Sequence, residues 1–464
     1  MGPVSFRDER TRGQLADIFM AGIRAVDPYR LVMERLSLQD GTTLVVGPGR
    51  YADEPPLRVD LSRCRRITVL GAGKAAAPMA RALEELLGDR IHEGAVAVTH
   101  GNTGRLRRIR LMEAGHPVPD ANSAAAAARL LRLADRAGEG DLVIVLLSGG
   151  GSALLAAPLS HTAAPGLTLE HVQEVTRALL ASGATIDEMN CVRKHLSAIK
   201  GGRLAARIHP ARALTLVLSD VVGDRLDSIA SGPLVFDRTT FEQALEVLAR
   251  YGIESRIPRT ALAVLQAGSS GDIPETPKRG DPAVSGVHTV VLGGTLTALL
   301  AAAGQARGLG FTTVALSAQI TGEAREVARF YAGVAREQAR SRLLGAPPLC
   351  VLGGGETTVT VRGRGKGGRN QEMALGFLIE FLGEQEEDPG GGIGFLAAST
   401  DGTDGPTDAA GAMVLPGRDR ADPAEARRRL ADNDSYGFFR DRGGLFTTGP
   451  TSTNVCDLHI LTVR

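Results

Sequence analysis

The chain has 464 residues, of which 43% are hydrophobic and 23% are charged, and its formal net charge is +1. This balance is typical of a globular protein with more than one domain, and the absence of a basic stripe argues against nucleic acid or an anionic membrane as a partner. Four scattered cysteines without a C-x-x-C pair, a charged N-terminus without an apolar core, and the lack of a long apolar run predict a cytoplasmic protein without a membrane span.

Apolar strands alternate with amphipathic helices along the chain, which predicts an α/β fold. We expect a strand, a glycine turn and a helix at 66–87, a strand at 94–100, a helix at 122–137, a strand ending in glycines at 141–151, helical stretches at 167–184 and 186–208, and a strand with a polar loop at 213–224. Residues 268–286 are rich in Gly, Pro and Ser, and are expected to form a linker or a long loop. A strand, helix and strand follow at 288–317, and the alternation at 358–361 predicts a hairpin ahead of a helix. The pattern predicts two α/β domains with largely parallel sheets, at 1–275 and 285–464.

The segment VIVLLSGGGSALLAAP, at 143–158, ends an apolar strand in three consecutive glycines directly before a helix. Glycines allow backbone N–H groups to approach a ligand closely, and the start of a helix favours an anion. We expect phosphate oxygens to be held by Ser148, Gly149, Gly150, Gly151 and Ser152. The alternative is a tight turn that only packs the helix onto its strand. A nucleophilic role for Ser152 is disfavoured, because Leu154 stands where a G-x-S-x-G motif requires glycine.

A second glycine turn, VLGAGKAAAPMA at 69–80, fits the small-residue spacing of dinucleotide-binding proteins. A nicotinamide-dependent enzyme also needs a carboxylate about 20 residues later, and the next strand ends in VTHGNTG without one.

Only five of the 53 basic residues are lysines, and four of these lie in motifs rich in glycine or in other cations. Because lysine is a compact charge suited to phosphate, we expect Lys74 to contact a phosphate, and Lys200 with Gly201 to contact the nucleotide.

Two groups of aspartates follow predicted strands, in SDVVGDRLDSIASGP at 219–233 and in AASTDGTDGPTDAAGAMV at 397–414. Oxygen ligands on loops suit Mg²⁺, which binds through one or two carboxylates together with substrate phosphates. The candidate metal ligands are Asp220, Asp224, Asp401 and Asp404, with Glu356 as a further acidic candidate. The alternative is that these aspartates only form turns.

Eight motifs resemble, in order, those of the glycerate 2-kinases whose C-terminal part is named the MOFRL domain. Among them are GAGKAAAPMA, GHPVPDANS, LLSGGGSALL, NCVRKHLSAIKGGRLA, GGGETTVTVRGRGKGGRNQEMAL and TTGPTSTNVCDL. The resemblance runs from about residue 15 to the C-terminus. It implies two Rossmann-like α/β domains with the active site in the cleft between them, and transfer of phosphate from ATP with Mg²⁺ to D-glycerate, giving 2-phosphoglycerate. The family's catalytic lysine and motif arginine correspond to Lys74 and Arg369. The chain departs from the family pattern at four positions: Val222 replaces proline, Arg225 an acidic residue, Ser452 glycine and Cys456 asparagine.

Combined with the residue patterns, the resemblance suggests a role for each catalytic candidate. Lys74 would act on the transferring phosphoryl, Asp220 would bind Mg²⁺ or accept the hydroxyl proton, and Arg369 would bind the glycerate carboxylate as a bidentate fork. Lys366 and Asn370 would complete the substrate site. The alternative for Arg369 is a pair with Glu372 one turn along the next helix.

Two other function classes stay open at this stage. One is an NAD(P)-dependent hydroxypyruvate reductase, which the missing ribose-binding carboxylate disfavours. The other is a non-catalytic metabolite-binding module. The oligomeric state is open as well, with a homodimer as one alternative.

Overall fold

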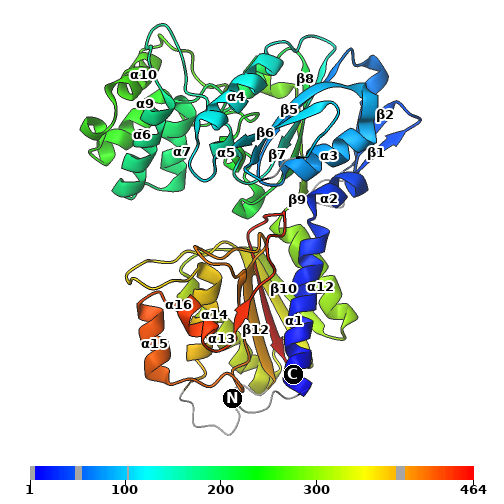
Figure 1. Ribbon diagram of the computed structural model, residues 1–464, viewed down its shortest axis with the longest axis vertical. Coiled ribbons are helices and arrows are strands. Elements are labelled where there is room, and N and C mark those ends of the chain that lie inside the picture. Colours follow the sequence, from blue (N-terminus) through cyan, green and yellow to red (C-terminus); the bar gives the residue numbers. More distant parts are fainter. Residues whose placement is uncertain (1–5, 48–54, 102–103, 383–391) are drawn as a thin grey trace. The chain divides into compact units, whose positions relative to one another are not determined.

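The computed structural model describes residues 6–47, 55–101, 104–382 and 392–464 (Figure 1). The chain forms two compact units. Unit 1 comprises Met1–Asp27 and Gly293–Arg464, and unit 2 comprises Pro28–Leu292. Within the described residues, no helix is long and apolar enough to cross a membrane.

Unit 2 is built on a six-stranded sheet with the order β6-β5-β4-β7-β8-β9. The strands are β4 (Ile67–Ala72), β5 (Ile91–Thr99), β6 (Ile109–Ala114), β7 (Leu142–Leu147), β8 (Arg212–Leu218) and β9 (Val287–Gly293). The registers from β6 through β8 are parallel. Every residue of β7 is buried, which explains its unbroken apolar sequence, because a central parallel strand is covered on both faces. A separate antiparallel sheet consists of β1 (Leu36–Gln39), β2 (Thr43–Val46) and β3 (Leu57–Asp60).

The helices of unit 2 contribute to two hydrophobic cores. The helices are α2 (Pro28–Arg35), α3 (Ala76–Leu87), α4 (Ala121–Ala134), α5 (Gly151–Leu154), α6 (Leu169–Ser182), α7 (Ile186–His195), α8 (Arg203–Ile208), α9 (Phe241–Arg250), α10 (Arg259–Ser269) and α11 (Pro282–Ser285). Helices α4 and α8 contribute to the hydrophobic core of the sheet, whereas α6, α7, α9 and α10 enclose a second core at one end of the unit (Figure 1). Capping boxes open α4 at Asp120, α6 at Thr168, α7 at Thr185 and α9 at Thr240, so local sequence sets where these helices begin.

Unit 1 contains a six-stranded sheet with the order β10-β11-β15-β12-β13-β14. The strands are β10 (Thr312–Ile320), β11 (Leu349–Gly355), β12 (Ile393–Ser399), β13 (Gly411–Val414), β14 (Leu445–Phe446) and β15 (Asp457–Val463). Only β10 and β11 pair in parallel, and the other four neighbouring pairs are antiparallel. The α/β prediction is therefore confirmed, but parallel pairing dominates only in unit 2. The C-terminal strand β15 accounts for two of these pairs, because it inserts antiparallel between β11 and β12, and β13 forms the other two with β12 and β14.

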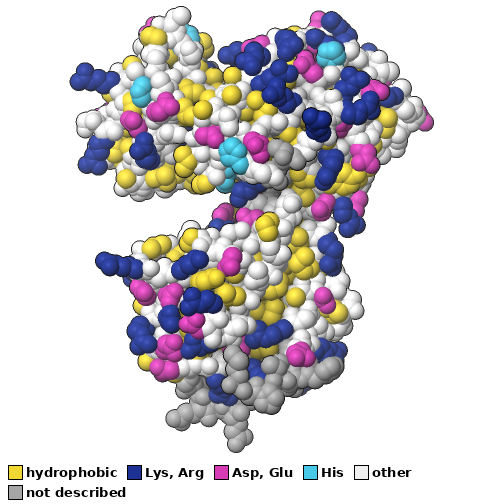
Figure 2. All heavy atoms as spheres, viewed as in Figure 1, with side chains coloured by type: hydrophobic (Ala, Val, Ile, Leu, Met, Phe, Trp, Pro, Cys, Tyr) yellow, Lys and Arg dark blue, Asp and Glu magenta, His cyan; other side chains and the backbone are white. Residues whose placement is uncertain are grey.

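The helices of unit 1 are α1 (Phe6–Ala25), α12 (Thr295–Gly308), α13 (Ala324–Ser341), α14 (Arg369–Ile379), α15 (Pro423–Ala431) and α16 (Ser435–Arg440). Helices α13 and α14 share one core with the sheet, in which the rings of Phe377 and Phe395 stack at 4.4 Å between centroids. Acidic and basic side chains intermingle on the surface near α15 and α16 (Figure 2). Arg442 accordingly pairs with Glu425 at 2.8 Å.

The division of the chain differs from the predicted boundary at two places. Residues 287–293 form β9, which lies next to β8 in the unit 2 sheet, so the strand expected to open the second domain closes the first. The first 27 residues belong to unit 1, where α1 packs on α12. A Cβ atom at Gly22 would lie 2.8 Å from Leu458 Cδ1, and Thr453 Oγ1 donates to the Val26 carbonyl at 2.7 Å. Contacts between distant parts of the chain decide both assignments.

The hairpin expected at 358–361 does not form. After β11 the chain continues without regular strands up to α14, with a single bridge between Glu323 and Thr358. Glu323 also accepts from the backbone N–H and the hydroxyl of Thr360, at 3.0 and 3.1 Å. The alternating residues therefore pack against the start of α13 rather than against a second strand.

Two of the four departures from the family pattern fall on left-handed backbone. Ser452 has a φ of 60° and Cys456 a φ of 67°. Glycine and asparagine, the residues expected at these positions, are the ones that adopt this conformation at least cost. The last loop therefore keeps a backbone for which its present side chains are poorly suited.

We expect Ser452→Gly to stabilise the protein by up to about 1 kcal/mol, because relief of the left-handed strain exceeds the added freedom of the unfolded chain. Ser452 is exposed, so no buried contact is lost. The matched control is Ser341→Gly at the end of α13, which should destabilise by about 0.5–1 kcal/mol because helical φ gives glycine no advantage. Melting temperatures of the two variants check the sign, and a lower value for Ser452→Gly would contradict the strain argument.

Candidate functional site

The carboxyl ends of the parallel strands of unit 2 bring four loops to one edge of the sheet. The chain runs from β4 outward through β5 to β6, then returns to β7 on the other side of β4. The order of the strands therefore reverses between β4 and β7, the position at which open α/β sheets bind ligands. The Lys74 N–H donates to the Gly149 carbonyl at 2.8 Å across this point. The two glycine motifs, 75 residues apart in the sequence, thus meet at the switch point.

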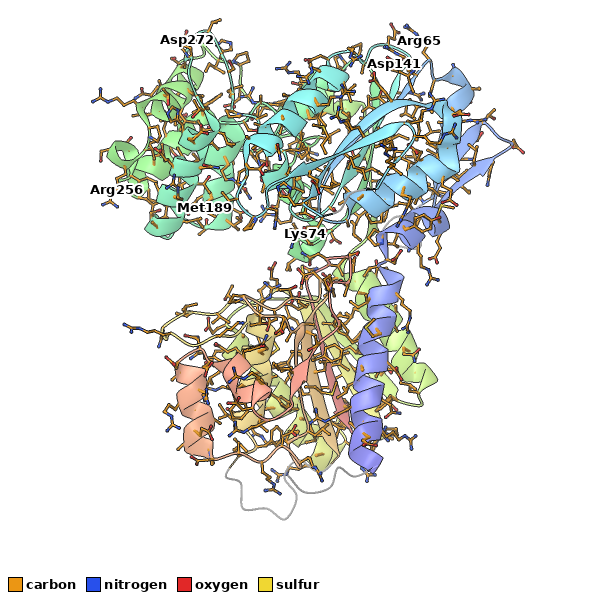
Figure 3. All side chains as sticks on the ribbon, viewed as in Figure 1. Arg65, Lys74, Asp141, Met189, Arg256 and Asp272 are labelled. Carbon is orange, nitrogen blue, oxygen red and sulfur yellow. The ribbon has the colours of Figure 1, made fainter. Side chains whose placement is uncertain are left out.

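The glycines of the SGGG turn give space to other side chains of the protein. A Cβ atom at Gly149 would lie 2.0 Å from Asp220 Oδ2, and one at Gly150 would lie 2.8 Å from His116 Cδ2 and 3.4 Å from Lys74 Cγ. Gly150 also has a φ of 83°, which favours glycine on its own account. The turn therefore gathers Lys74, His116 and Asp220, from the ends of β4, β6 and β8. Figure 3 shows Lys74 on this edge of unit 2.

The two serines that flank the glycines have different roles. Ser148 is 1% exposed, and its hydroxyl accepts from the Ala75 N–H at 3.0 Å, so it fastens the two turns together. Ser152 is partly exposed and receives hydrogen bonds from two cations. Arg193 Nη2 donates to its Oγ at 2.7 Å, and Lys200 Nζ donates to its carbonyl at 2.6 Å and also to its Oγ. Of the two serines, only Ser152 is exposed enough to contact a bound phosphate directly.

Lys200 is buried, and its neighbourhood is unusual for an ammonium group. Burial, together with the nearby Arg193 guanidinium, lowers the pKa of Lys200 well below its usual value. The adjacent Gly201 has a φ of 57°, and its N–H donates to the Ser231 carbonyl at 3.0 Å. Ser231 Oγ lies 3.0 Å from Ser152 Oγ. Lys200, Gly201 and Ser152 therefore belong to one cluster.

The strand ends of unit 1 carry a separate group of charges. Arg369, the first residue of α14, forms a bidentate pair with Asp457 at 2.6 and 3.0 Å, and its Nη1 donates to Glu356 at 2.7 Å. The Asp457 side chain is fully buried, whereas that of Glu356 is 45% exposed. The predicted alternative, a pair with Glu372, is wrong, because Glu372 pairs with Arg325 at 2.7 Å. The Nε and Nη2 edge of the guanidinium is thus fixed to buried Asp457, and Nη1 reaches the half-exposed Glu356.

Asp404 caps α14 and is not placed to bind a metal. The helix starts after Gly368, which has no side chain to accept the first N–H groups. Asp404 Oδ1 accepts from the Asn370 N–H at 3.1 Å, and Oδ2 accepts from the Gln371 N–H at 2.8 Å. The carboxyl group is 1% exposed, and burial raises its pKa to about 7 despite these donors. Because both oxygens are already used, the structure argues against Asp404 as a metal ligand.

The stability of the protein should therefore depend on Asp404 near neutral pH. Its pKa is raised from 3.8 to about 7, so the folded state holds the proton more tightly than the unfolded chain, and this contribution to stability is lost as the pH rises through that window. Asp404→Asn mimics the protonated form and removes the titration. We expect the melting temperature of the variant minus that of wild type to increase as the pH is raised from about 5 to about 8. A relative fall would mean that the N–H groups of α14 keep the carboxylate ionised.

The other two predicted substrate residues of unit 1 differ in how accessible they are to solvent. Asn370 is fully buried, and its amide donates to Asp404 Oδ1 at 3.3 Å. Lys366 is exposed and lies over the Tyr436 ring, 4.5 Å from its centroid. The neighbouring glycines serve packing, since a Cβ at Gly365 would lie 2.4 Å from Asp434 Cβ and one at Gly367 would lie 2.2 Å from Ser435 Oγ. The loop thus packs on residues 432–435.

The candidate metal ligands do not form a complete metal site among the residues that the structure describes. Within the residues that the structure describes, no group of three or more His, Cys, Asp or Glu could bind a metal ion. Asp220 and Asp224 lie on the loop after β8, and Asp401 lies after β12, where it accepts from the Ser399 hydroxyl and the Thr403 N–H at 3.0 and 2.9 Å. A Mg²⁺ ion that takes most of its ligands from phosphates and water needs only one or two such carboxylates. Asp220, which lies against Gly149 in the switch-point turn, fits that arrangement.

Three residues of these clusters were not predicted as site residues: His116, Arg193 and Asp457. All three lie inside motifs used for the resemblance, but nothing in their local spacing marks a role. His116 follows β6, Arg193 lies in the last turn of α7, and Asp457 opens β15. Only pairing and packing between distant segments bring them to Gly150, Ser152 and Arg369.

Two family models match the chain: a domain of unknown function, DUF4147, over residues 14–266, and the MOFRL family over residues 349–457. A D-glycerate 2-kinase of Thermotoga maritima is 42% identical over 441 residues, which are 94% of this chain and 99% of that protein. A protein of Agrobacterium vitis, whose name gives hydroxypyruvate reductase as a provisional activity, is 43% identical over 99% of this chain and 96% of its own length. The crystal structure of a glycerate kinase from Thermotoga maritima has a TM-score of 0.81 to this structure at 39% identity, covering 98% of this chain and 100% of that one.

The fold and the switch-point site thus define a two-unit α/β protein in which a DUF4147 region precedes a MOFRL region. The resemblance drawn from the motifs is confirmed, since similarity extends over nearly the whole length of both chains. The chain belongs to the glycerate kinase family.

Proposed function

We propose that this protein is a glycerate 2-kinase, which transfers the terminal phosphoryl group of ATP to the 2-hydroxyl group of D-glycerate. The observation that supports the proposal best is the convergence of Lys74, Gly149 and Asp220 at the switch point of the unit 2 sheet. Phosphoryl transfer depends mainly on positioning and on neutralisation of charge, and a lysine with a carboxylate supplies these. The likeness to a D-glycerate 2-kinase over nearly the whole chain supports the choice of acceptor.

Each residue has a separate part in the proposed reaction. The 2-hydroxyl oxygen attacks the γ-phosphorus, the bond to the leaving oxygen of ADP breaks, and a carboxylate accepts the hydroxyl proton. Lys74 neutralises the transferring phosphoryl, and Asp220 is the candidate for the proton acceptor. Arg369 binds the glycerate carboxylate through the edge that Glu356 now occupies, because this exposed partner is the one that a substrate can replace.

Kinases of many folds use ATP as a magnesium complex, and the loop after β8 offers ligands for such an ion. Asp220 would contact the metal if another group accepts the proton, and Asp224 on the same loop is the second candidate. When bound, Mg²⁺ neutralises charge on the nucleotide phosphates. The donor set suits this metal because carboxylate oxygens are its usual protein ligands.

A coupled assay tests the proposal directly. Purified protein is mixed with D-glycerate, MgATP and enolase, and formation of phosphoenolpyruvate is followed without any phosphoglycerate mutase. We expect phosphoenolpyruvate to appear at once, since enolase accepts only the 2-phosphate. If it forms only after a mutase is added, the product is the 3-phosphate, and the proposed position of transfer is wrong. NADH consumption with hydroxypyruvate at a comparable rate would favour the reductase instead.

A further inference from the structure

Unit 2 contains a pocket of about 560 Å³ next to the Ser152 cluster. Its walls are formed by α6, α7 and the segments 117–119 and 152–158, and most of the side chains that line it are apolar. Val118 and Leu180 belong to this lining, yet they are 65% and 60% exposed. Figure 2 shows hydrophobic side chains on the part of unit 2 that carries these helices. An apolar pocket of this size with a few polar groups is typical of a binding site for an organic ligand.

One end of the pocket is cationic. Arg193 and Lys200 line it and converge on Ser152, as described above, and Lys200 is only 6% exposed. Among the residues that the structure describes, neither cation has a carboxylate in ion-pairing distance. Burial is the main cause that lowers the pKa of each group. A buried lysine side by side with a half-buried arginine is costly unless an anion compensates their positive charges. A ligand for this pocket should therefore combine an apolar part with a strongly anionic part.

The pocket adjoins the switch-point turn. Pro117 in its wall directly follows His116, the residue that occupies the space beside Gly150, and Ser152 directly follows the glycines. Met189, which also lines the pocket, lies toward the same margin of unit 2 as Lys74 (Figure 3). A ligand whose anionic end lies at Arg193 and Lys200 would therefore have its charged groups next to the turn that carries Lys74.

We propose that this pocket binds the nucleotide, with phosphates at Arg193 and Lys200 and the base among the apolar residues of α6 and α7. The inference rests on the proposed kinase function, which supplies ATP as a substrate. Of the two substrates only the nucleotide has a flat apolar group, and a three-carbon acid would leave most of the volume and of the apolar wall unused. Lys74 then marks the end of the phosphate chain at which transfer takes place.

Filling the pocket should weaken nucleotide binding and leave the acceptor site unchanged. Val172 is a partly buried wall residue on α6, and Glu174 is an exposed residue of the same helix outside the lining. We expect Val172→Trp to raise the Kd of ADP, measured by calorimetry, by about tenfold or more, and Glu174→Trp to change it less than about twofold. The KM for glycerate should stay near the wild-type value. An unchanged Kd for ADP, or a selective rise of the glycerate KM, would overturn the assignment.

Lys200→Met provides a second test with a readout besides affinity. It replaces a buried amino group by an apolar end and keeps most of the length of the side chain, so we expect a higher melting temperature together with a Kd for ADP raised at least about tenfold. A lower melting temperature with normal ADP binding would show that Lys200 is structural.

Labelling of wild-type protein with 8-azido-ATP needs no variant, and the modified peptide should include residues 169–180 or 186–196. Labelling elsewhere would contradict the proposal.

The outcomes separate this inference from the proposed function. Wild-type protein that binds ADP in the pocket but forms no phosphoenolpyruvate in the coupled assay would contradict the kinase proposal alone. Wild-type protein that forms phosphoenolpyruvate while Val172→Trp and Lys200→Met bind ADP normally would contradict the pocket assignment alone.

Discussion

Lys74→Ala is expected to lower kcat by about 100-fold or more, with the fold intact. The side chain is half-buried at the switch point, and its loss removes a positive charge from the place where the phosphoryl group is proposed to be transferred. The structural role of this position belongs to the backbone, since the Lys74 N–H donates to Gly149 at 2.8 Å and alanine retains that bond. Turnover in the coupled assay and a melting curve measure the two effects separately.

Two further substitutions control for charge and geometry. Lys74→Arg keeps the charge on a planar group and should recover only part of the lost activity. Arg81→Ala removes an exposed cation from α3, where it lies 5.4 Å from the centroid of the Tyr29 ring, and should leave the kinetic constants within about twofold of wild type. Near-normal turnover of Lys74→Ala would exclude this residue from the active site and leave 71–76 as a turn that only connects strand and helix.

Arg369→Lys should reduce both stability and substrate affinity, for two separate reasons. A single ammonium group cannot reproduce the two hydrogen bonds to buried Asp457, so the melting temperature should fall by several degrees. If the edge near Glu356 binds the substrate carboxylate, the KM for glycerate should rise several-fold and kcat should fall, while the KM for ATP should change less than about twofold.

The chain offers a matched control for the structural part of this effect. Arg325 donates through Nε and Nη2 to buried Glu372 at 3.1 and 2.7 Å, in the same unit and with a similarly exposed side chain. Arg325→Lys should therefore lower the melting temperature by a similar amount without changing the KM for glycerate. Equal kinetic constants in the two variants would make Arg369 a purely structural residue. A selective loss of ATP affinity in Arg369→Lys would instead assign this arginine to the nucleotide.

The glycine turns show how far sequence reasoning extends. A strand that ends in Ser148 and three glycines predicted a turn that holds phosphate. The turn is present, and the phosphate stays a prediction. Asp220 and His116 fill the spaces beside Gly149 and Gly150, and their identity depends on which strands are neighbours in the sheet. Asp404 illustrates the same limit, because its position after a strand suggested a metal ligand. In the structure its carboxylate caps α14, since Gly368 at the start of that helix has no side chain to accept the first N–H groups.

By itself the sequence determined the α/β class, the starts of α4, α6 and α7, the family and the turn that carries Lys74. These features depend on local periodicity, on capping residues such as Thr168 and on ordered motifs, all of which are contained in short segments. Only the tertiary structure decided that α1 belongs to unit 1, that β9 closes the sheet of unit 2, that β15 runs antiparallel between β11 and β12, and that Arg193 joins Lys200 at Ser152. The physical reason is that strand pairing and the burial of charges depend on neighbours distant in the chain, for which no single segment carries a local signal.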